Sequence, residues 1–219
     1  MEEYLAKQVG EELFITWIVS PTVIFGRHQV MEAEVNVDFC RANGIAMYRR
    51  KSGGGCVYAD EGNLMMSMIS PNKHSEVVFQ QFLDKISDVL RHWGLPAVKS
   101  EHNDIMVEGK KVSGNACYAL STGTIVHGTM LVDVDLDMLQ QAITPSKEKL
   151  AKHGVKSVRQ RVANLARLVT NPQLRTSTLV ANRLSDALCL YQRELIEQEI
   201  ATIDRIEQSY LDPQFIVGK

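Results

Sequence analysis

Three consecutive glycines at positions 53–55 separate two apolar, strand-like runs of the chain. Glycine loses more backbone freedom on folding than any other residue, so a triplet is disfavoured inside a helix or a strand. The triplet therefore predicts a loop between the strand predicted at 45–48 and the apolar run that begins at Val57. A backbone without Cβ atoms can press its N–H groups against a ligand. Arg49 and Arg50 favour an anionic ligand, because a guanidinium group matches carboxylate and phosphate oxygens.

The same segment also fits a simple turn whose arginines face water, since glycine clusters commonly mark loops. No Gly-Lys-Ser/Thr follows the triplet, which excludes a Walker-type phosphate loop. The Gly-x-Gly-x-x-Gly dinucleotide fingerprint is also missing from this segment. By itself, the loop indicates an anion site and leaves the plain turn open.

Composition narrows the class of protein. The 219 residues are 45% hydrophobic and 23% charged, which is typical of a globular chain with one large domain. The formal net charge of −2 lacks the basic field of nucleic-acid-binding proteins, so we expect no nucleic-acid partner. No apolar run approaches the roughly 20 residues that span a bilayer, so we expect no membrane partner. The acidic N-terminus does not resemble a signal peptide.

The cysteines and histidines do not have the spacing of common zinc sites. The four cysteines are far apart, with no Cys-x-x-Cys pair, and the six histidines include no His-x-x-x-His. We therefore expect reduced thiols, no zinc site and a cytoplasmic protein.

Hydrophobic periodicity predicts a single α+β domain, with a mixed or antiparallel sheet backed by helices. Strands are predicted at residues 14–19, 22–25, 45–48, 64–69 and 104–107, with a return strand from 111, and at 124–134 with an interruption at Gly128. Helices are predicted at residues 1–10, 35–43, 75–93, 136–142, 146–153 and 179–194. Ser75 is expected to cap its helix. Residues 196–200 are predicted to form a last strand and 206–210 a helical turn.

Four polar clusters lie at the edges of predicted strands: Arg49–Gly55, Asn103-Asp104, Lys111–Ala116 and His127–Thr129. Each has an ordinary explanation when taken singly. An Asn-Asp pair often forms a turn, a strand lysine is usually solvated, and a lone histidine is more often hydrogen-bonded than catalytic.

Together, these clusters resemble the signature of the lipoate–protein ligase A family. Arg-Arg-x-Ser-Gly-Gly-Gly-x-Val-Tyr at 49–58, followed by Gly62-Asn63-Leu64, matches the family's first motif. Asn103-Asp104 with 111–114 matches the second motif, 127–131 the third, and the segment 149–165 the fourth. The motifs follow the family's order, and the resemblance runs from about Glu2 to Lys219.

The resemblance implies a fold like that of biotin–protein ligases and class II aminoacyl-tRNA synthetases, and one catalytic domain over 1–219. It implies a reaction in two steps. Lipoate and ATP first give lipoyl-AMP and pyrophosphate, and a lysine of a lipoyl domain then takes the lipoyl group and releases AMP. The expected ligands are ATP, Mg²⁺ and lipoate. The expected acceptors are lipoyl domains of 2-oxoacid dehydrogenase E2 subunits or the glycine cleavage H protein.

The resemblance also assigns residues to the two steps. Lys111 is the expected catalytic residue, a point charge between the lipoate carboxylate and the α-phosphate. The expected nucleotide-binding residues are Arg50, Gly55, Cys56, Val57, Tyr58, Asn103, Asp104 and Lys111. The expected lipoate-binding residues are Arg49, Ser52, Gly53, Gly54, Lys111 and His127. Asp104 is also the candidate ligand for Mg²⁺, which favours carboxylate and phosphate oxygens.

Two positions depart from the family pattern. His102 stands where the family commonly has arginine before Asn-Asp, and Cys56 replaces a common alanine. Related octanoyltransferases use a cysteine thioester in place of ATP, with the cysteine before the Asn-Asp region. Residues 95–100 hold no cysteine, which favours the ligase. Cys117, just beyond the Lys111 strand, keeps a thioester transferase as the alternative.

Other hypotheses also remain. A lipoyl-AMP-binding module without catalysis is one, and Lys111 and Asp104 argue against it. A biotin–protein ligase is disfavoured, because its usual loop is of a Gly-Arg-Gly-Arg type. Two-domain ligases continue beyond Gly218 into a small accessory domain that helps adenylation. We expect this domain to be absent from 1–219. Three explanations fit the absence of this domain from 1–219. The chain needs a separate partner protein, or it only transfers preformed lipoyl-AMP, or the sequence covers just the catalytic part.

Overall fold

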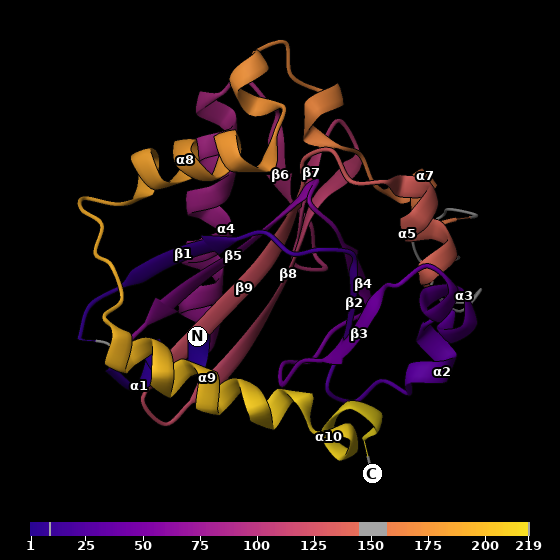
Figure 1. The fold of residues 1–219 in the computed structure, drawn as a ribbon. Helices are drawn as coiled ribbons and strands as arrows, with labels where there is room; N and C mark the ends of the chain where they lie inside the picture. The colour runs from indigo at the N-terminus through magenta and orange to yellow at the C-terminus, as the bar shows by residue number, and fades with distance from the viewer. Residues whose placement is uncertain (9, 145–156, 219) are drawn as a thin grey trace.

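The computed structural model of the chain describes residues 1–8, 10–144 and 157–218. The helix predicted at 146–153 lies outside these residues. The described strands form a six-stranded sheet and a three-stranded sheet, with helices packed around them (Figure 1). This architecture confirms the predicted α+β class with a mixed or antiparallel sheet.

The large sheet is antiparallel throughout, with strand order β1-β5-β9-β8-β7-β6. Its strands are β1 (Leu13–Trp17), β5 (Asn63–Ser70), β6 (Ala97–Lys99), β7 (Asp104–Val107), β8 (Lys110–Leu120) and β9 (Gly123–Leu131). The predicted hairpin is confirmed, since β7 and β8 are joined by Glu108 and Gly109, both with positive φ, as a two-residue turn requires. The predicted interruption at Gly128 is wrong, because Gly128 pairs with Met66 and Asn115 within a continuous β9.

The small sheet pairs β2 (Thr22–Phe25) in parallel with β3 (Ala46–Arg49) and antiparallel with β4 (Val57–Ala59). It packs against α2 (Met31–Glu34), α3 (Val37–Ala42) and α5 (Leu136–Ala142) around a core of its own. The helix predicted at 35–43 is confirmed as α3, which begins two residues later than predicted. Asn36 begins a new helix there, because its side chain accepts a hydrogen bond from the backbone of Phe39.

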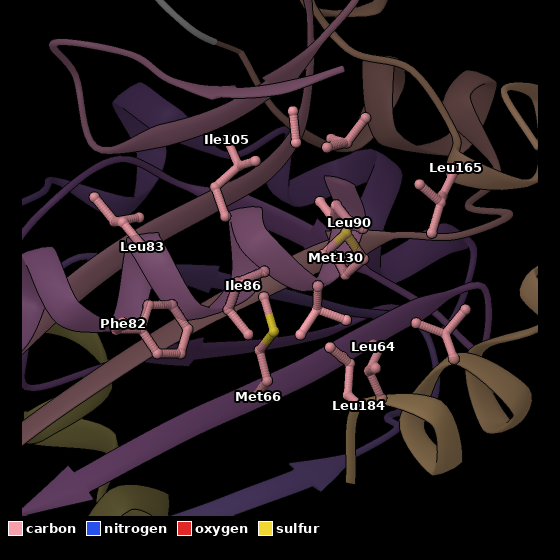
Figure 2. Packing of buried hydrophobic residues seen from close by; sticks show 14 of the residues in the cluster. Leu64, Met66, Phe82, Leu83, Ile86, Leu90, Ile105, Met130, Leu165 and Leu184 are labelled. Atoms are coloured by element: carbon pink, nitrogen blue, oxygen red, sulfur yellow. The ribbon is translucent and has the colours of Figure 1, made fainter. Parts of the chain in front are cut away.

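The main core lies between one face of the large sheet and the helices α4 (Ser75–His92) and α8 (Ser177–Leu188). Figure 2 shows Phe82, Ile86 and Leu90 of α4 beside Leu64 and Met66 of β5. Burial of each such side chain stabilises the fold by about 1.5–3 kcal/mol. The helical spacing of apolar residues at 75–93 correctly predicted α4. The expected Ser75 cap is wrong, because the helix begins after His74 without a side-chain cap.

The C-terminal part of the chain is more helical than predicted. The helix predicted at 179–194 ends at Leu188, and the strand predicted at 196–200 is instead the start of α9 (Glu197–Leu211). A short apolar run does not distinguish the two forms, and here Glu199 accepts a hydrogen bond from the backbone of Ile196 and starts a helix. The remaining described elements are α1 (Glu2–Gln8), α7 (Val158–Arg161), α10 (Pro213–Val217) and the 3-10 turns η1 (Leu165–Arg167) and η2 (Pro172–Leu174).

Two further expectations concern the whole chain. All four cysteines are free thiols, as predicted. Over the described residues, no helix combines the length and the apolar composition that crossing a membrane requires.

Candidate active site

A cavity of about 610 Å³ lies between the large sheet and the loop that precedes β4. Cross-strand partners share a face of a sheet, and Met65, Thr129 and Gly114 are such partners, as are His127 and Ala116. All five line the cavity, and their strand neighbours Leu64 and Met66 lie in the main core. The cavity floor is therefore the sheet face opposite the main core. Its other wall consists of Ile24, Arg50, Gly54, Gly55, Cys56 and Val57.

One end of the cavity holds three charged side chains. The Nζ of Lys111 lies 2.8 Å from Oδ1 of Asp104, and the guanidinium of Arg161 pairs with the other carboxylate oxygen. Asp104 begins β7 opposite Gly114, and Lys111 lies near the start of β8. Lys111 also forms a parallel bridge with Val162, which brings Arg161 beside it. Lys111 and Arg161, fifty positions apart in the sequence, therefore meet at one carboxylate.

Gly114 provides the space for this arrangement. A Cβ atom added there would lie 2.5 Å from Nζ of Lys111. The lysine side chain thus folds back over the glycine toward Asp104. A larger residue at 114 would displace the ammonium group from the cavity end.

The charged end favours an anionic ligand. Burial lowers the pKa of Lys111, and the charge and hydrogen bond of Asp104 oppose that change only in part. Two cations face one carboxylate, so a net positive charge remains at this end of the cavity. A phosphate or carboxylate group would complete the charge balance.

Arg50 organises the glycine loop from inside. Its Nη2 donates to the carbonyls of Gly53 and Gly55, both at 2.7 Å, and its Nη1 donates to Ile24 at 3.1 Å. Burial lowers the pKa of Arg50. The residue therefore lines the cavity and also fixes the curvature of the loop.

Arg49 points the other way, so its predicted place against lipoate needs correction. Adjacent residues of an extended chain project to opposite sides, and Arg49 lies outside the cavity lining. Its guanidinium donates to six carbonyl oxygens and lies 4.8 Å from the ring centroid of Phe25. Its side chain is thus committed to the protein backbone and does not reach the cavity.

A polar chain of contacts lies toward the other end of the cavity. Ser52 Oγ is 2.7 Å from Nε2 of His127, whose Nδ1 is 3.2 Å from Oε1 of Glu2. Burial alone would raise the pKa of Glu2, but the charge and hydrogen bond of His127 and a hydrogen bond from Ser67 outweigh it and lower that pKa. His127 and Glu2 line the cavity, and Ser52 supports them from behind.

The cavity thus brings most of the predicted site residues together. The predicted residues that line it are Arg50, Gly54, Gly55, Cys56, Val57, Asn103, Asp104, Lys111 and His127. The predicted residues outside its lining are Arg49, Ser52, Gly53 and Tyr58. Sequence reasoning missed Arg161 and Glu2. The fourth motif contains Arg161, which is the signal that could have found it, whereas nothing in the sequence links Glu2 to His127.

The candidate Mg²⁺ ligand, Asp104, is already engaged with cations in the ligand-free protein. Both of its oxygens are paired with cations, and Mg²⁺ would have to displace one of them. In the part of the chain that the structure describes, no three His, Cys, Asp or Glu side chains gather in a cluster that could hold a metal. Asp104 can accept Mg²⁺ only when Lys111 or Arg161 leaves it, and its assignment as the Mg²⁺ ligand stays a prediction.

Cys117 is poorly placed for nucleophilic chemistry. It packs against the main core, on the opposite sheet face from His127 and Ala116, and is absent from the cavity lining. Burial raises the pKa of its thiol, which disfavours the reactive thiolate.

Comparison with known proteins places these features in a family. Residues 1–188 match the lipoyl protein ligase A/B catalytic domain family. The lipoate-protein ligase LplJ of Bacillus subtilis is 36% identical over 169 residues, covering 76% of this chain and 51% of the relative. Lipoate–protein ligase 1 of Staphylococcus aureus is 38% identical over 175 residues, covering 78% and 53%. The chain therefore spans about half the length of these curated relatives.

Solved structures agree with the sequence comparison. A bipartite lipoate protein ligase from Thermoplasma acidophilum, described with its E2 lipoyl domain, superposes with a TM-score of 0.83 at 29% identity, covering 99% of this chain and 89% of that one. A putative ligase of T. acidophilum with bound lipoic acid gives 0.82 at 28%, covering 100% and 91%. A lipoate-protein ligase A bound with ATP gives 0.82 at 27%, covering 99% and 91%. The chain belongs to the lipoyl protein ligase A/B catalytic domain family.

Proposed function

We propose that this chain is a lipoate–protein ligase that activates lipoate with ATP and transfers the lipoyl group to a protein lysine. The observation that carries the proposal is the pairing of Lys111 and Arg161 with Asp104 at one end of a cavity whose remaining lining is largely uncharged. Relatives of the same fold have been described with lipoic acid and with ATP. Lipoyl-AMP is a mixed anhydride of an apolar acyl group and a phosphate, so its binding requires a charged end and an apolar lining in one cavity.

In the first step, a lipoate carboxylate oxygen forms a bond to the α-phosphorus, and the bond to pyrophosphate breaks. Two anions must approach each other, so fixed positive charge at the point of contact lowers the barrier. Lys111 supplies that charge, because its ammonium can move from Asp104 to the oxygens of the ligand. Arg161 stays on Asp104, so the carboxylate keeps a partner during this exchange.

The nucleotide lies against the Arg50 loop in this proposal. Gly54, Gly55, Cys56 and Val57 line the cavity wall there, and their backbone can approach a phosphate or ribose closely. Asn103 lies opposite, beside Asp104. Mg²⁺ would enter with the phosphates of ATP and neutralise part of their charge, and the Asp104 oxygen that Lys111 leaves is its candidate protein ligand.

The acyl chain extends from Lys111 toward His127. Gly114 lies beneath the Lys111 ammonium, and Ala116 pairs with His127. These two residues are two apart on β8, so they are separated by about 7 Å along the strand. Met65, Thr129 and Trp17 line the same cavity. Burial against such a surface is worth about 0.8 kcal/mol per CH₂, which gives affinity for the chain but little discrimination between lipoate and octanoate.

In the second step, the amine of an acceptor lysine attacks the acyl carbon and AMP leaves. A bipartite relative has been described with its E2 lipoyl domain, which supports lipoyl domains as acceptors. The glycine cleavage H protein is a second acceptor of the same chemistry. A separate accessory protein is a further proposed partner, and the reduced cysteines support a cytoplasmic location.

The decisive experiment measures pyrophosphate release from ATP with lipoate, octanoate or biotin, in the absence of any acceptor. Release that depends on lipoate establishes activation by this chain alone. Transfer from added lipoyl-AMP without such release means that a second protein is required for the first step. The proposed function would be refuted if the protein showed no pyrophosphate release and also no transfer from lipoyl-AMP.

A further inference from the structure

The two residues that flank Arg50 both point away from the cavity, toward the ends of the chain. Arg49 contacts α10, and Lys51 lies 2.6 Å from Oε1 of Glu3 in α1. The ammonium of Lys51 also lies 4.6 Å from the ring centroid of Tyr210 in α9, and the Tyr210 hydroxyl donates to Glu3 at 2.6 Å. The nucleotide loop is therefore held on its outer side by three helices.

Arg49 makes the more extensive of these contacts. It is only 5% exposed, and its acceptors are the carbonyls of residues 215–217 in α10 and of residues 26, 27 and 29. Carbonyls at the end of a helix carry partial negative charge, which suits a buried cation. A single guanidinium thus links α10 to the segment 26–29.

The segment 26–29 in turn supports the glycine loop. The backbone N–H of Arg27 donates to the carbonyl of Ser52 at 2.9 Å, and Gly26 packs directly on the carbonyl of Gly54. Arg50 donates its own backbone N–H to Phe25 at 3.0 Å. A continuous chain of contacts therefore leads from α10, through Arg49, to the wall of the cavity.

The helix α9 can detach from α1 and from the loop without unfolding the core. None of its residues is buried, and Ile200 and Leu211 are exposed. Its hydrogen bonds to α1 involve Tyr210 and Glu199, and the Tyr210 ring also lies against Lys51 of the loop. Elements that are held by few apolar contacts open locally at a low free-energy cost. Figure 1 shows α9 and α10 running along the outside of the molecule, past α1 and the small sheet.

We propose that Arg49 and Lys51 are positioning residues that hold α9 and α10 as a strap on the nucleotide loop. When the strap is seated, the segment 26–29 is fixed and Arg50 and Gly54 have one arrangement. When it is released, the loop loses its outer support and the nucleotide wall loses its geometry. The ligand at this wall rests on the proposed function, whereas the coupling itself is a property of the ligand-free protein.

Gly218 offers a test from outside the loop. Its φ is +74°, and an added Cβ would lie 2.6 Å from Nη2 and 2.8 Å from Cζ of Arg49. Gly44 has a φ of +65°, but no atom lies within 4 Å of its added Cβ. Gly218→Ala and Gly44→Ala therefore introduce similar backbone strain, and only the first displaces Arg49.

The first measurement is hydrogen exchange at the backbone amides of Arg27 and Arg50 in the ligand-free protein. We expect Gly218→Ala to speed their exchange by about tenfold or more and Gly44→Ala to leave it unchanged. Arg49→Lys, which retains the charge but lacks the fork that reaches six carbonyls, should act like Gly218→Ala. Equal protection in all variants would overturn the strap proposal.

The second measurement is the KM for ATP in lipoate-dependent pyrophosphate release. We expect Gly218→Ala to raise it about tenfold, with Gly44→Ala at the wild-type value, because small misplacements at a reacting centre have large effects. An unchanged KM in an active Gly218→Ala protein would also overturn the proposal. A wild-type protein that neither releases pyrophosphate nor transfers from lipoyl-AMP would refute the proposed function. The exchange experiment would still test the strap proposal, because it uses the ligand-free protein.

Discussion

The ammonium of Lys111 and the carboxylate of Asp104 form an ion pair of 2.8 Å before any ligand is present. Burial lowers the pKa of Lys111, and the nearby carboxylate opposes part of that effect, so the pair favours the charged form of the lysine. Arg161 holds the second carboxylate oxygen. Lys111 can therefore leave Asp104 for a phosphate without creating an unpaired buried anion, whose cost would be several kcal/mol.

Lys111→Met should abolish adenylate formation while the protein remains folded. The side chain keeps its approximate length but loses the charge at the α-phosphate, and removal of one such group typically costs about 10²–10³ in rate. Pyrophosphate release measures the effect, and the melting temperature checks the fold. Lys99→Ala is the matched control, because Lys99 is a strand lysine that pairs with Asp84 at 2.6 Å outside the cavity. A Lys111→Met protein with wild-type release would contradict the assignment.

The rate of adenylation should fall on the alkaline side below the ordinary lysine pKa of 10.5. Only the protonated form of Lys111 carries the charge, and burial lowers its pKa, so that form is lost at a lower pH than for an exposed lysine. Asp104→Asn removes the carboxylate that opposes this change, so the alkaline limb should move further toward neutral pH. The measurement is kcat/KM for ATP against pH. An Asp104→Asn profile identical to the wild-type profile would argue against coupling of the two groups.

Arg161→Gln should reduce activity by about tenfold or more while leaving the ion pair of Lys111 and Asp104 in place. Without Arg161, Lys111 must remain on Asp104 to satisfy it, so transfer of the ammonium to the ligand becomes unfavourable. Pyrophosphate release measures the loss. Arg159→Gln is the control on the same short helix, because Arg159 pairs with the exposed Asp137. Equal activity of the two variants would remove Arg161 from the proposed site.

Glu2→Gln should lower stability near neutral pH and have a smaller effect in acid. The folded pKa of Glu2 lies below its ordinary value of 4.5, so its contribution is complete above pH 4.5 and is lost as pH falls through the folded pKa. The free energy of unfolding in denaturant, measured for both proteins from pH 7 to pH 3, checks this. A difference that grows toward acid would have the wrong sign for this ion pair.

Cys117→Ser should leave acyl transfer unaffected, because Cys117 faces the main core. The assay mixes the protein with octanoyl carrier protein and a lipoyl domain without ATP, and we expect no transfer in either protein. Cys56 lines the cavity, so Cys56→Ser belongs in the same series. Transfer without ATP that depends on either thiol would favour the alternative transferase.

Much of the fold followed from local patterns. The helix α4 was predictable because Phe82, Ile86 and Leu90 repeat at the spacing of one helical face. The hairpin of β7 and β8 was predictable because Gly109 supplies the conformation that its turn requires. The strand predicted at 196–200 failed because five residues with two isoleucines do not distinguish a strand from the first turn of a helix.

The candidate site was predictable as a set of motifs and less so as an arrangement. Local sequence could not decide which of Arg49 and Arg50 faces the cavity. Adjacent side chains of a strand point to opposite faces of the sheet, but the sequence does not show which face borders the cavity. The partners of Arg49 lie in residues 215–217, far beyond any local pattern. The contact of Glu2 with His127 likewise depends on how α1 packs on the large sheet.

The bond from Arg49 to the carbonyl of Phe215 joins positions 166 residues apart. During synthesis, every strand of the large sheet is complete long before residue 215 leaves the ribosome. The contacts of Arg49 with residues 215–217 therefore form only after the strands of the large sheet have been synthesised. A rigid fusion placed directly after Val217 would disturb the same carbonyls, so we expect it to weaken the support of the loop.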